Sequence, residues 1–319
     1  MGLSCNRTGT ATLLGALTLA GLSLPCTYVL PVLGNEISPD QTLGDESSTL
    51  RQVSDRRTQV EGGAIRGRHL FHSFSDFSIR ELQEVYFANP SGIEAILGRI
   101  TGDRPSSILG TLGVDGEASL FLLNPNGFVF GENAVLDIRG SFVASTSDRF
   151  EFANGLDFSA THPNAAPLLT VDVPVGVQLG ESALGDIDSL AQLSTGQDLT
   201  LDGRDIAVQG GLAAGGDVTV QATQTLQVRD QVSQPFLASA GGQLELQGNA
   251  QLDISALSHP ESYILAGDTL TLRSSAPVIG DGRFQSGDSF RVATLEDQPG
   301  DLRSPNDPVI RSAGDVTLN

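Results

Sequence analysis

Short apolar runs separated by turn-forming residues make up most of the chain from residue 64 onward. Residues 120–146 show the pattern most clearly: an apolar run, the tetrapeptide Asn-Pro-Asn-Gly, a second apolar run, a connector and a third run. The runs are too short for ordinary helices and contain Phe and Val, which favours strands. In the tetrapeptide, Pro125 fixes the backbone at the second turn position, Asn126 tolerates the third, and Gly127 leaves the exit free. These residues predict strands joined by a tight turn, and turn chemistry alone accounts for each of them.

A loose repeat begins near residue 195. Its unit is a glycine or small residue, a polar residue and then an alternating apolar strand. The polar positions are Asp198, Asp217, Gln243, Asp268, Asp288 and Asp315, with spacings of 19, 26, 25, 20 and 27 residues. This period, without a helical phase, predicts a β-solenoid whose inward Leu and Val side chains form one continuous core. We expect the aspartates to be solvated caps at the coil corners, because the tandem Gly-Gly-x-Gly-x-Asp units of calcium-binding solenoids do not occur.

Two segments before residue 120 have other patterns. The polar stretch of residues 35–63 contains several turn formers and predicts a leading strand or two with exposed loops, at the start of a cap. Ile93, Ile96, Leu97 and Ile100 keep a helical period instead, which predicts one short helix of about two turns.

The first 34 residues have the features of a secretion signal. Arg7 gives a positive start, an apolar run covers residues 11–33, and small residues precede a cleavage position after Gly34, with Ala20 as a second choice. The alternative is a membrane anchor, since the run is long enough to span a bilayer. Pro25, Pro31, Thr18 and Thr27 interrupt the run, which favours the signal.

Acidic residues outnumber basic ones by 38 to 18, giving a formal net charge of −20, and the basic residues are all Arg. Without Lys, the chain cannot build a Walker-type phosphate loop, a Schiff-base lysine or a pyridoxal site. Affinity for phosphate backbones comes from clustered cations. We therefore expect no nucleic-acid partner, no nucleotide and no cofactor.

Residue patterns that carry catalysis or bind metals are sparse. There is no Gly-x-Ser-x-Gly elbow and no His-Glu-x-x-His helix. His69 and His72 are three residues apart, which places them on opposite faces of a strand. We therefore expect no metal site there, and expect both to be surface or half-buried strand residues.

An enzymatic alternative is a secreted polysaccharide lyase or hydrolase built on a β-helix. Such a site needs a carboxylate cluster on one face, or paired carboxylates at the separation used in hydrolysis. The close acidic pairs considered in the solenoid region are Asp186 with Asp188 and Asp202 with Asp205, and we expect no basic or histidine partner beside them. Solvated charges at strand ends account for the same residues, so we expect no enzyme activity.

The order of the motifs along the chain resembles a known family. Besides residues 120–146, the motifs occupy residues 70–74, 87–93, 96–102, 107–112, 158–161 and 171–177. As an ordered set they are similar to the N-terminal haemagglutination-activity domain of filamentous haemagglutinin-like proteins, the exported partners of two-partner secretion systems. The resemblance covers roughly residues 37–180.

Two Asn-Pro motifs carry the functional side of this resemblance. Asn124, Pro125, Asn126 and Gly127 match the family motif Asn-Pro-Asn-Gly-Ile, with Phe in the last place. The slot of the other motif, Asn-Pro-Asn-Leu, holds Asn89 and Pro90 followed by Ser-Gly-Ile. The resemblance implies that these residues form the secretion motif read by the transporter, while the departure weakens the match at Asn89 and Pro90.

The resemblance also implies a fold and a destination. The fold is all-β, a right-handed parallel β-helix with an N-terminal cap and minor antiparallel strands outside the helix. The periplasmic domains of an outer-membrane two-partner-secretion transporter would be the partner. The protein would be secreted or held at the cell surface, as a surface adhesin with a host or cell-surface ligand.

Three segments follow from these observations. We expect a signal peptide at residues 1–34, a two-partner-secretion domain at 35–185 and continuing β-helix coils at 186–319. The last residues stop in or just after a strand of the repeat, so we expect a truncated chain or one that ends on an unprotected coil.

Both cysteines, Cys5 and Cys26, fall within the expected signal, so the mature chain would contain none. No disulfide then holds it folded in an oxidising periplasm. Reducing agents should accordingly leave the melting temperature of the mature chain unchanged in a thermal unfolding experiment. A shift on reduction would mean that a cysteine remains and that the assigned cleavage position is wrong.

Overall fold

The computed structural model describes residues 36–152, 155–164, 178–179 and 183–319, which fold almost entirely as strands. The chain divides into two compact units, residues 1–33 and 34–319, of which the second is described. The predicted signal at 1–34, with cleavage positions Gly34 and Ala20, lies outside the described residues. In the described ranges, no helix has the length and apolar character needed to cross a membrane.

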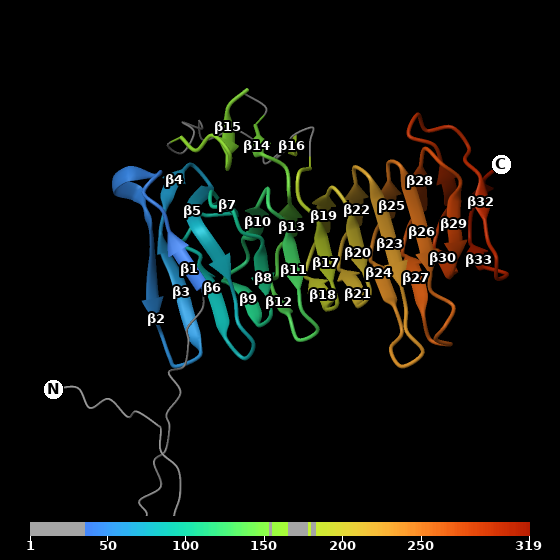
Figure 1. The fold of residues 1–319 in the computed structure, drawn as a ribbon, viewed down its shortest axis with the longest axis horizontal. Coiled ribbons are helices and arrows are strands. Elements are labelled where there is room, and N and C mark those ends of the chain that lie inside the picture. The colour runs from blue at the N-terminus through green and yellow to red at the C-terminus, as the bar shows by residue number, and fades with distance from the viewer. Residues whose placement is uncertain (1–35, 153–154, 165–177, 180–182) are drawn as a thin grey trace, which may run out of the picture. The chain divides into compact units, whose positions relative to one another are not determined.

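The described unit is a right-handed parallel β-helix, as the sequence predicts (Figure 1). Each coil passes through sheet A, then sheet C, then a third face formed by sheet B in the early coils and sheet E in the later ones. Sheet A has twelve strands: β1 (Glu36–Pro39), β4 (Ala64–Arg66), β5 (His69–Ser78), β7 (Ala95–Ile100), β10 (Ser119–Leu123), β13 (Phe142–Ser145), β19 (Leu199–Gly203), β22 (Val218–Ala222), β25 (Leu244–Gly248), β28 (Leu270–Ser274), β31 (Phe290–Ala293) and β34 (Val316–Thr317).

The other two faces are completed by shorter strands. Sheet C has eight: β8 (Ser106–Ile108), β11 (Phe128–Phe130), β17 (Ile187–Ser189), β20 (Ile206–Val208), β23 (Thr225–Arg229), β26 (Gln251–Ser255), β29 (Val278–Asp281) and β32 (Leu302–Arg303). Sheet B has five: β2 (Ser48–Gln52), β3 (Arg57–Gly62), β6 (Glu84–Ala88), β9 (Thr111–Asp115) and β12 (Val135–Asp137). Sheet E has six: β18 (Gln192–Thr195), β21 (Gly211–Ala214), β24 (Leu237–Ala240), β27 (Tyr263–Ala266), β30 (Arg283–Ser286) and β33 (Val309–Ser312).

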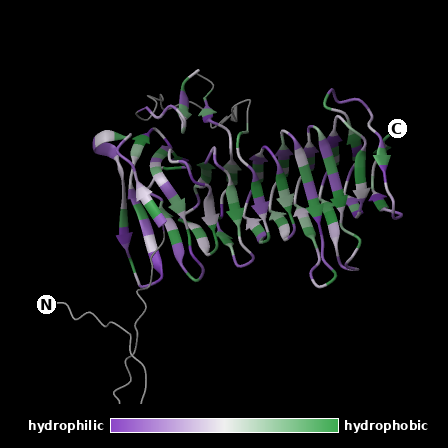
Figure 2. Cartoon of the chain, in the orientation of Figure 1, coloured by the Kyte–Doolittle hydropathy of each residue, from purple (hydrophilic) through white to green (hydrophobic). Residues whose placement is uncertain are grey.

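Alternating side chains build the core. In β22, Val218 and Val220 are fully buried while Thr219 between them is on the outer face. The parallel register stacks Val218 between Leu199 and Leu244 of the neighbouring coils, so the inward residues join into one core along the helix. Figure 2 shows the alternation of apolar and polar positions along the later strands.

Antiparallel strands occur at the amino end and outside the helix, as expected. At the amino end, β1 pairs with β5, β2 with β3, and β4 with β5; a short 3-10 turn, η1 (Gly44–Glu46), joins β1 to β2. After β13 the chain leaves the helix at Thr146 and returns at β17. This excursion contains the small antiparallel sheet D, made of β14 (Arg149–Glu151), β15 (Asp157–Ser159) and β16 (Gln178–Leu179).

The outer face of sheet A carries three rows of side chains, which the parallel register aligns from strand to strand. The row nearest the carboxyl ends of the strands is Ser73, Arg99, Leu123, Ser145 and Asp202. The middle row is Phe71, Leu97, Phe121, Val143 and Thr200. The row nearest the amino ends is His69, Ala95, Ser119 and Ser141, with Asp198 at the next corner.

A second apolar cluster covers a portion of this outer face. Phe150, Phe152 and Phe158 of the excursion pack on the middle row. The ring centroids of Phe158 and Phe71 lie 4.9 Å apart. The early strands of sheet A are therefore buried on both faces.

The helix predicted for residues 93–100 is wrong, because this segment contains the strand β7. Ile96 and Ile100 face the solenoid core, whereas Ala95 and Leu97 face the second cluster. A strand buried on both faces has a continuous apolar run instead of an alternating one. Its apolar spacing can then imitate that of a helix.

The spacing between successive aspartates of the repeat corresponds to one coil of the solenoid. Asp198, Asp217 and Asp315 each stand directly before a strand of sheet A, whereas Asp268 and Asp288 lie one residue earlier. The capping role is confirmed where the repeat begins: Asp198 Oδ1 accepts the N–H of Asp217 at 2.9 Å, and Asp217 Oδ1 accepts that of Gln243 at 2.7 Å.

His69 and His72 do lie on opposite faces of β5, but the prediction that they are surface or half-buried is wrong. Both are buried, and the exposed fraction of His72 is zero. His72 packs against Phe74 and Phe87, and its Nδ1 lies 3.0 Å from the hydroxyl of Ser48. Its Nε2 has no hydrogen-bond partner. The adjacent coil of the cap, which the sequence pattern did not specify, covers this side chain.

Burial of His72 makes the stability of the fold sensitive to acid. It lowers the pKa of His72 from 6.5 to about 3, so the folded protein binds this proton far more weakly than the unfolded chain. The contribution of neutral His72 to the free energy of unfolding is therefore fully present above about pH 6.5. Between pH 6 and pH 4 the free energy of unfolding falls by roughly 1.4 kcal/mol for each pH unit. Denaturant unfolding across this range measures the slope.

His72→Asn is the matched variant, because it keeps a polar group near Ser48 without a titrating ring. It should lose this component of the pH slope whatever its absolute stability. An unchanged slope in the variant would show that other groups govern the acid response.

Candidate functional site

The turn predicted at Asn124 to Gly127 lies at the corner between sheets A and C. It connects β10 to β11, and the N–H of Gly127 donates to the carbonyl of Asn124 at 3.0 Å. Pro125 and Asn126 are thus the two central residues, as the sequence predicts, and Gly127 has a φ of +111°. The strand β10 ends here because the turn directs the backbone out of sheet A and into sheet C.

The side chain of Asn124 is fully buried and uses all of its hydrogen-bonding capacity. Its Nδ2 donates to the carbonyl of Arg104 and the hydroxyl of Ser106, both at 3.0 Å. Its Oδ1 accepts from the backbone N–H and the side-chain amide of Asn126, also both at 3.0 Å. An amide offers two donors and about two acceptor sites, so none is left for a partner.

Neighbouring coils hold the turn on both sides. On the preceding coil, the carbonyl of Gly102 accepts from the Asn126 amide at 2.8 Å. On the following coil, the chain returns from the excursion at Gly185 and Asp186. A Cβ at Gly127 would lie 2.5 Å from the Asp186 carbonyl, and one at Gly185 would lie 2.5 Å from the Gly127 nitrogen. The turn therefore fits only between these two coils at close backbone contact.

The other Asn-Pro pair forms a different turn, at the corner between sheets B and A. Here the N–H of Ile93 donates to the carbonyl of Pro90 at 3.1 Å, and Gly92 has a φ of +86°. Asn89 stands just before the turn. Oriented to satisfy its neighbours, its amide accepts from the N–H groups of Glu117 and Ala118 at 3.3 and 3.2 Å and donates to the Ile93 carbonyl at 3.1 Å.

The structure does not bring the two motifs together. Asn89 precedes β7 and Asn124 follows β10, and these strands are parallel neighbours in sheet A. The two residues therefore lie at opposite ends of these neighbouring strands, and a strand of five residues separates them by about 17 Å. Asn89 is half-buried and Pro90 is exposed.

Sequence reasoning missed Arg99, which is 1 % exposed. Its guanidinium donates to the hydroxyls of Ser73 and Thr42 and to the carbonyls of Ser159 and Asn164, at 2.6 to 3.0 Å. Burial lowers the pKa of Arg99 to about 10, so the charge persists at neutral pH. The side chain joins the cap, sheet A and the excursion. The sequence signal that could have identified this residue is a single Arg within an apolar run.

Asp40 completes this network without touching Arg99 directly. Burial opposes its ionisation, but hydrogen bonds from Thr42, Thr101 and Ser73 outweigh that effect and lower its pKa. The same Thr42 and Ser73 hydroxyls also contact Arg99, so a half-buried carboxylate and a buried guanidinium share them.

The fold separates one of the two acidic pairs considered for polysaccharide chemistry, Asp202 with Asp205. Asp202 is buried, where it accepts from the hydroxyls of Ser145 and Ser147, and burial raises its pKa. Asp186, Asp188 and Asp205 do line one shallow hollow of about 230 Å³.

Contrary to the expectation of no basic partner, Arg204 pairs with both Asp186 and Asp205, at 2.9 and 3.4 Å. These are exposed ion pairs, which are ordinary on protein surfaces. In the described ranges, no group of three or more His, Cys, Asp or Glu residues is arranged to hold a metal ion.

Comparison with known proteins gives a family and a fold. Residues 35–286 match the family model described as TPS secretion domain. The crystal structure of the filamentous hemagglutinin secretion domain is similar, with a TM-score of 0.58 and 15 % identity over 88 % of this chain and 99 % of that one. The crystal structure of the HMW1 secretion domain from Haemophilus influenzae gives a TM-score of 0.41 and 15 % identity over 89 % of this chain and 84 % of that one. A search of curated proteins finds no match.

Replacing Asn124 tests how firmly its turn is held. Asn124→Ala leaves the Arg104 carbonyl and the Ser106 hydroxyl without their donor in a buried site, and should lower the free energy of unfolding by about 2–4 kcal/mol. Asn126→Ala is the matched control, because Asn126 is exposed and should cost less than about 1 kcal/mol. Denaturant unfolding measures both, and equal losses would contradict the assigned role of Asn124.

Proposed function

Because the chain belongs to the family of TPS secretion domains, and so carries the N-terminal domain of a two-partner-secretion exoprotein, we propose that an outer-membrane transporter recognises this domain from the periplasm and exports the chain. The observation that carries the proposal is the family match over residues 35–286, on a chain that folds as a β-helix. The family is one of secretion domains and not of enzymes. The protein would then be secreted or retained at the cell surface.

We assign the secretion motif to both Asn-Pro turns, Asn89 with Pro90 and Asn124 to Gly127. The role of Asn124 is indirect: its side chain is fully buried and its donors and acceptors are used within the protein. What a transporter contacts is the surface that these turns shape. Both turns lie within residues 35–185, where we place the recognised region, and residues 186–319 continue the coils.

Folding outside the cell gives the export step a direction. Each coil pairs in parallel with the coil before it, so a coil that emerges can dock on those already folded. Each docking step buries apolar side chains and so opposes return of the chain through the pore. Export driven by stepwise folding in this way does not require nucleotide hydrolysis.

We also propose that the exported protein acts as a surface adhesin. The support is the similarity in fold to the filamentous hemagglutinin secretion domain. The coils beyond the excursion present polar outer positions at regular spacing, such as Thr219 and Glu245, which suits display in water. The ligand would be bound by groups outside the secretion motif.

Secretion of variants from a Gram-negative host carrying the transporter tests the proposal. Asn124→Ile should reach the periplasm but not the medium, because Ile cannot replace the four hydrogen bonds that hold the turn. Immunoblots of periplasm and medium, with and without the transporter, measure the distribution.

Leu246→Ala is the matched control, since it removes a fully buried side chain from a later coil at a cost of about 2–5 kcal/mol without touching either motif. It should still be secreted. Normal secretion of Asn124→Ile, or release of the unmodified chain without the transporter, would refute the motif assignment.

A further inference from the structure

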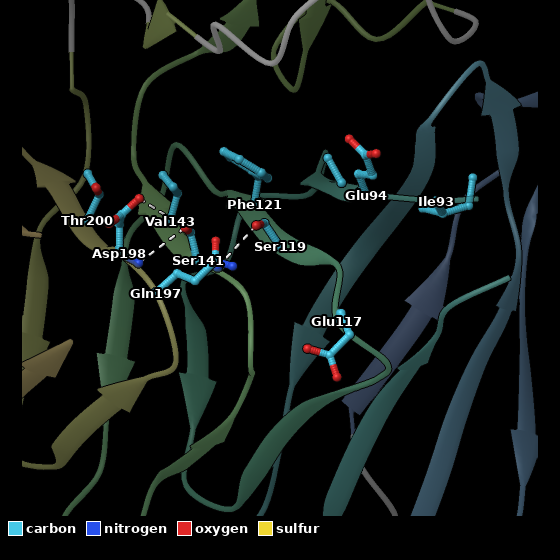
Figure 3. Close-up of a pocket in the computed structure, with 11 residues that line it drawn as sticks. Ile93, Glu94, Glu117, Ser119, Phe121, Ser141, Val143, Gln197, Asp198 and Thr200 are labelled. Atoms are coloured by element: carbon cyan, nitrogen blue, oxygen red, sulfur yellow. Dashed lines mark hydrogen bonds between the residues drawn. The ribbon is translucent and has the colours of Figure 1, made fainter. Parts of the chain in front are cut away.

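A groove of about 540 Å³ runs along the outer face of sheet A, and none of the residues that line it belongs to the described excursion strands (Figure 3). It crosses the strands β7, β10, β13 and β19. Its floor consists of Ala95, Phe121 and Val143, which belong to or pack against the second apolar cluster. The groove therefore continues the same apolar surface on which Phe150, Phe152 and Phe158 are already seated.

The rim toward the amino ends of the strands is acidic. Glu94, Glu117 and Asp198 line it, and Figure 3 shows Asp198 beside Ser141. Glu94 and Glu117 are each paired with an exposed arginine, Arg68 and Arg139, at 2.6 and 2.8 Å. Asp198 has no ion-pair partner among the residues described, although its carboxylate accepts from Ser141 and from the N–H of Asp217.

The Asn89 motif holds this rim in place. Its amide bonds to the backbone of Ile93 and Glu117, and both of these residues line the groove. The secretion motif at the amino edge of sheet A is thus connected to the groove by direct hydrogen bonds, although Pro90 and Ser91 themselves are exposed to solvent.

We propose that this groove is where a segment of the transporter docks, an inference that rests on the proposed function. The occupant is an extended segment that places apolar side chains over Phe121 and Val143 and one cationic side chain at Asp198. Four neighbouring strands span about 14 Å, the length of roughly four extended residues. Charge complementarity at Asp198 and continuity with the apolar layer select this occupant.

Filling the groove tests the proposal, and Thr200 is the position for it. Thr200 lies on the groove floor beside Val143, is half-buried, and makes no side-chain hydrogen bond to another described residue. Thr219 stands beside it in the next coil, on the same outer row but outside the groove, and is the matched control. Thr200→Trp should reduce transporter-dependent secretion about tenfold, as expected for blocking a central contact, while Thr219→Trp should change it less than about twofold.

Single cysteines identify the occupant. The sequence has no cysteine after residue 26, so Thr200→Cys or Thr219→Cys in the full chain introduces a single thiol into the exported protein. A thiol-linked photocrosslinker at position 200 should label a transporter segment that mass spectrometry can identify, with a markedly weaker signal from position 219. A crosslink confined to one chain, or one between two copies of this protein, would overturn the proposal.

Asp198→Asn tests the charge while keeping an oxygen that can accept the N–H of Asp217. It should weaken crosslinking from position 200 severalfold, whereas Asp268→Asn at a later corner should not. Melting curves of the purified variants check that each remains folded, and Thr200→Arg replaces the Trp variant if that one does not.

The outcomes separate the two proposals. If the unmodified chain is not secreted by its transporter, the proposed function fails and the groove proposal fails with it. If the chain is secreted but Thr200→Trp is secreted equally and position 200 does not crosslink to the transporter, the groove proposal alone is wrong.

Discussion

At every corner of this β-helix, the backbone N–H and C=O groups need hydrogen-bond partners that the strand ladder does not provide. Buried N–H and C=O groups without partners are costly, and at a corner the regular ladder between coils is interrupted. The chain meets this constraint with side chains that bond to the next coil at the same position. Asp198 and Asp217 do so before sheet A, and Asn124 bonds to the preceding coil after it. Corner residues thus contribute to the stacking as the strands do.

The same constraint explains how the excursion is tolerated. The chain leaves the helix after β13 and rejoins it at β17, and hydrogen bonds between the points of exit and return hold the two together. Thr146 donates to the carbonyl of Gly185, and Asp202 accepts from Ser145 and Ser147. Arg99 then fixes the far end of the excursion to the cap through Ser159 and Thr42. The buried charge of Arg99 is tolerated because its hydrogen bonds all go to oxygen atoms, and because the half-buried Asp40 carboxylate shares two of the hydroxyls that bind it.

The sequence predicted what depends on local chemistry and missed what depends on distant partners. The turn at Asn124, the one-coil spacing of the aspartates and the alternation of Val and Thr in β22 each follow from neighbouring residues. The strand β7 was misassigned because its outer face is covered by phenylalanines some 50 residues later. Arg99 was missed for the same reason, since its hydrogen-bond partners Thr42 and Asn164 are 57 and 65 residues away. The burial of His72 likewise depends on a cap strand that the pattern did not place.

The two Asn-Pro turns differ in their local geometry but bound the same surface. One turn lies at the amino ends of the strands of sheet A and the other at their carboxyl ends. The outer face of the sheet therefore lies between the two turns. Neither turn requires an exposed asparagine side chain in order to matter, because displacing a corner displaces the strands attached to it. A motif whose Asn124 side chain is buried is therefore consistent with recognition of the face between the turns. The groove on that face is lined by residues whose backbone bonds to the Asn89 amide, which connects this turn to the proposed docking surface.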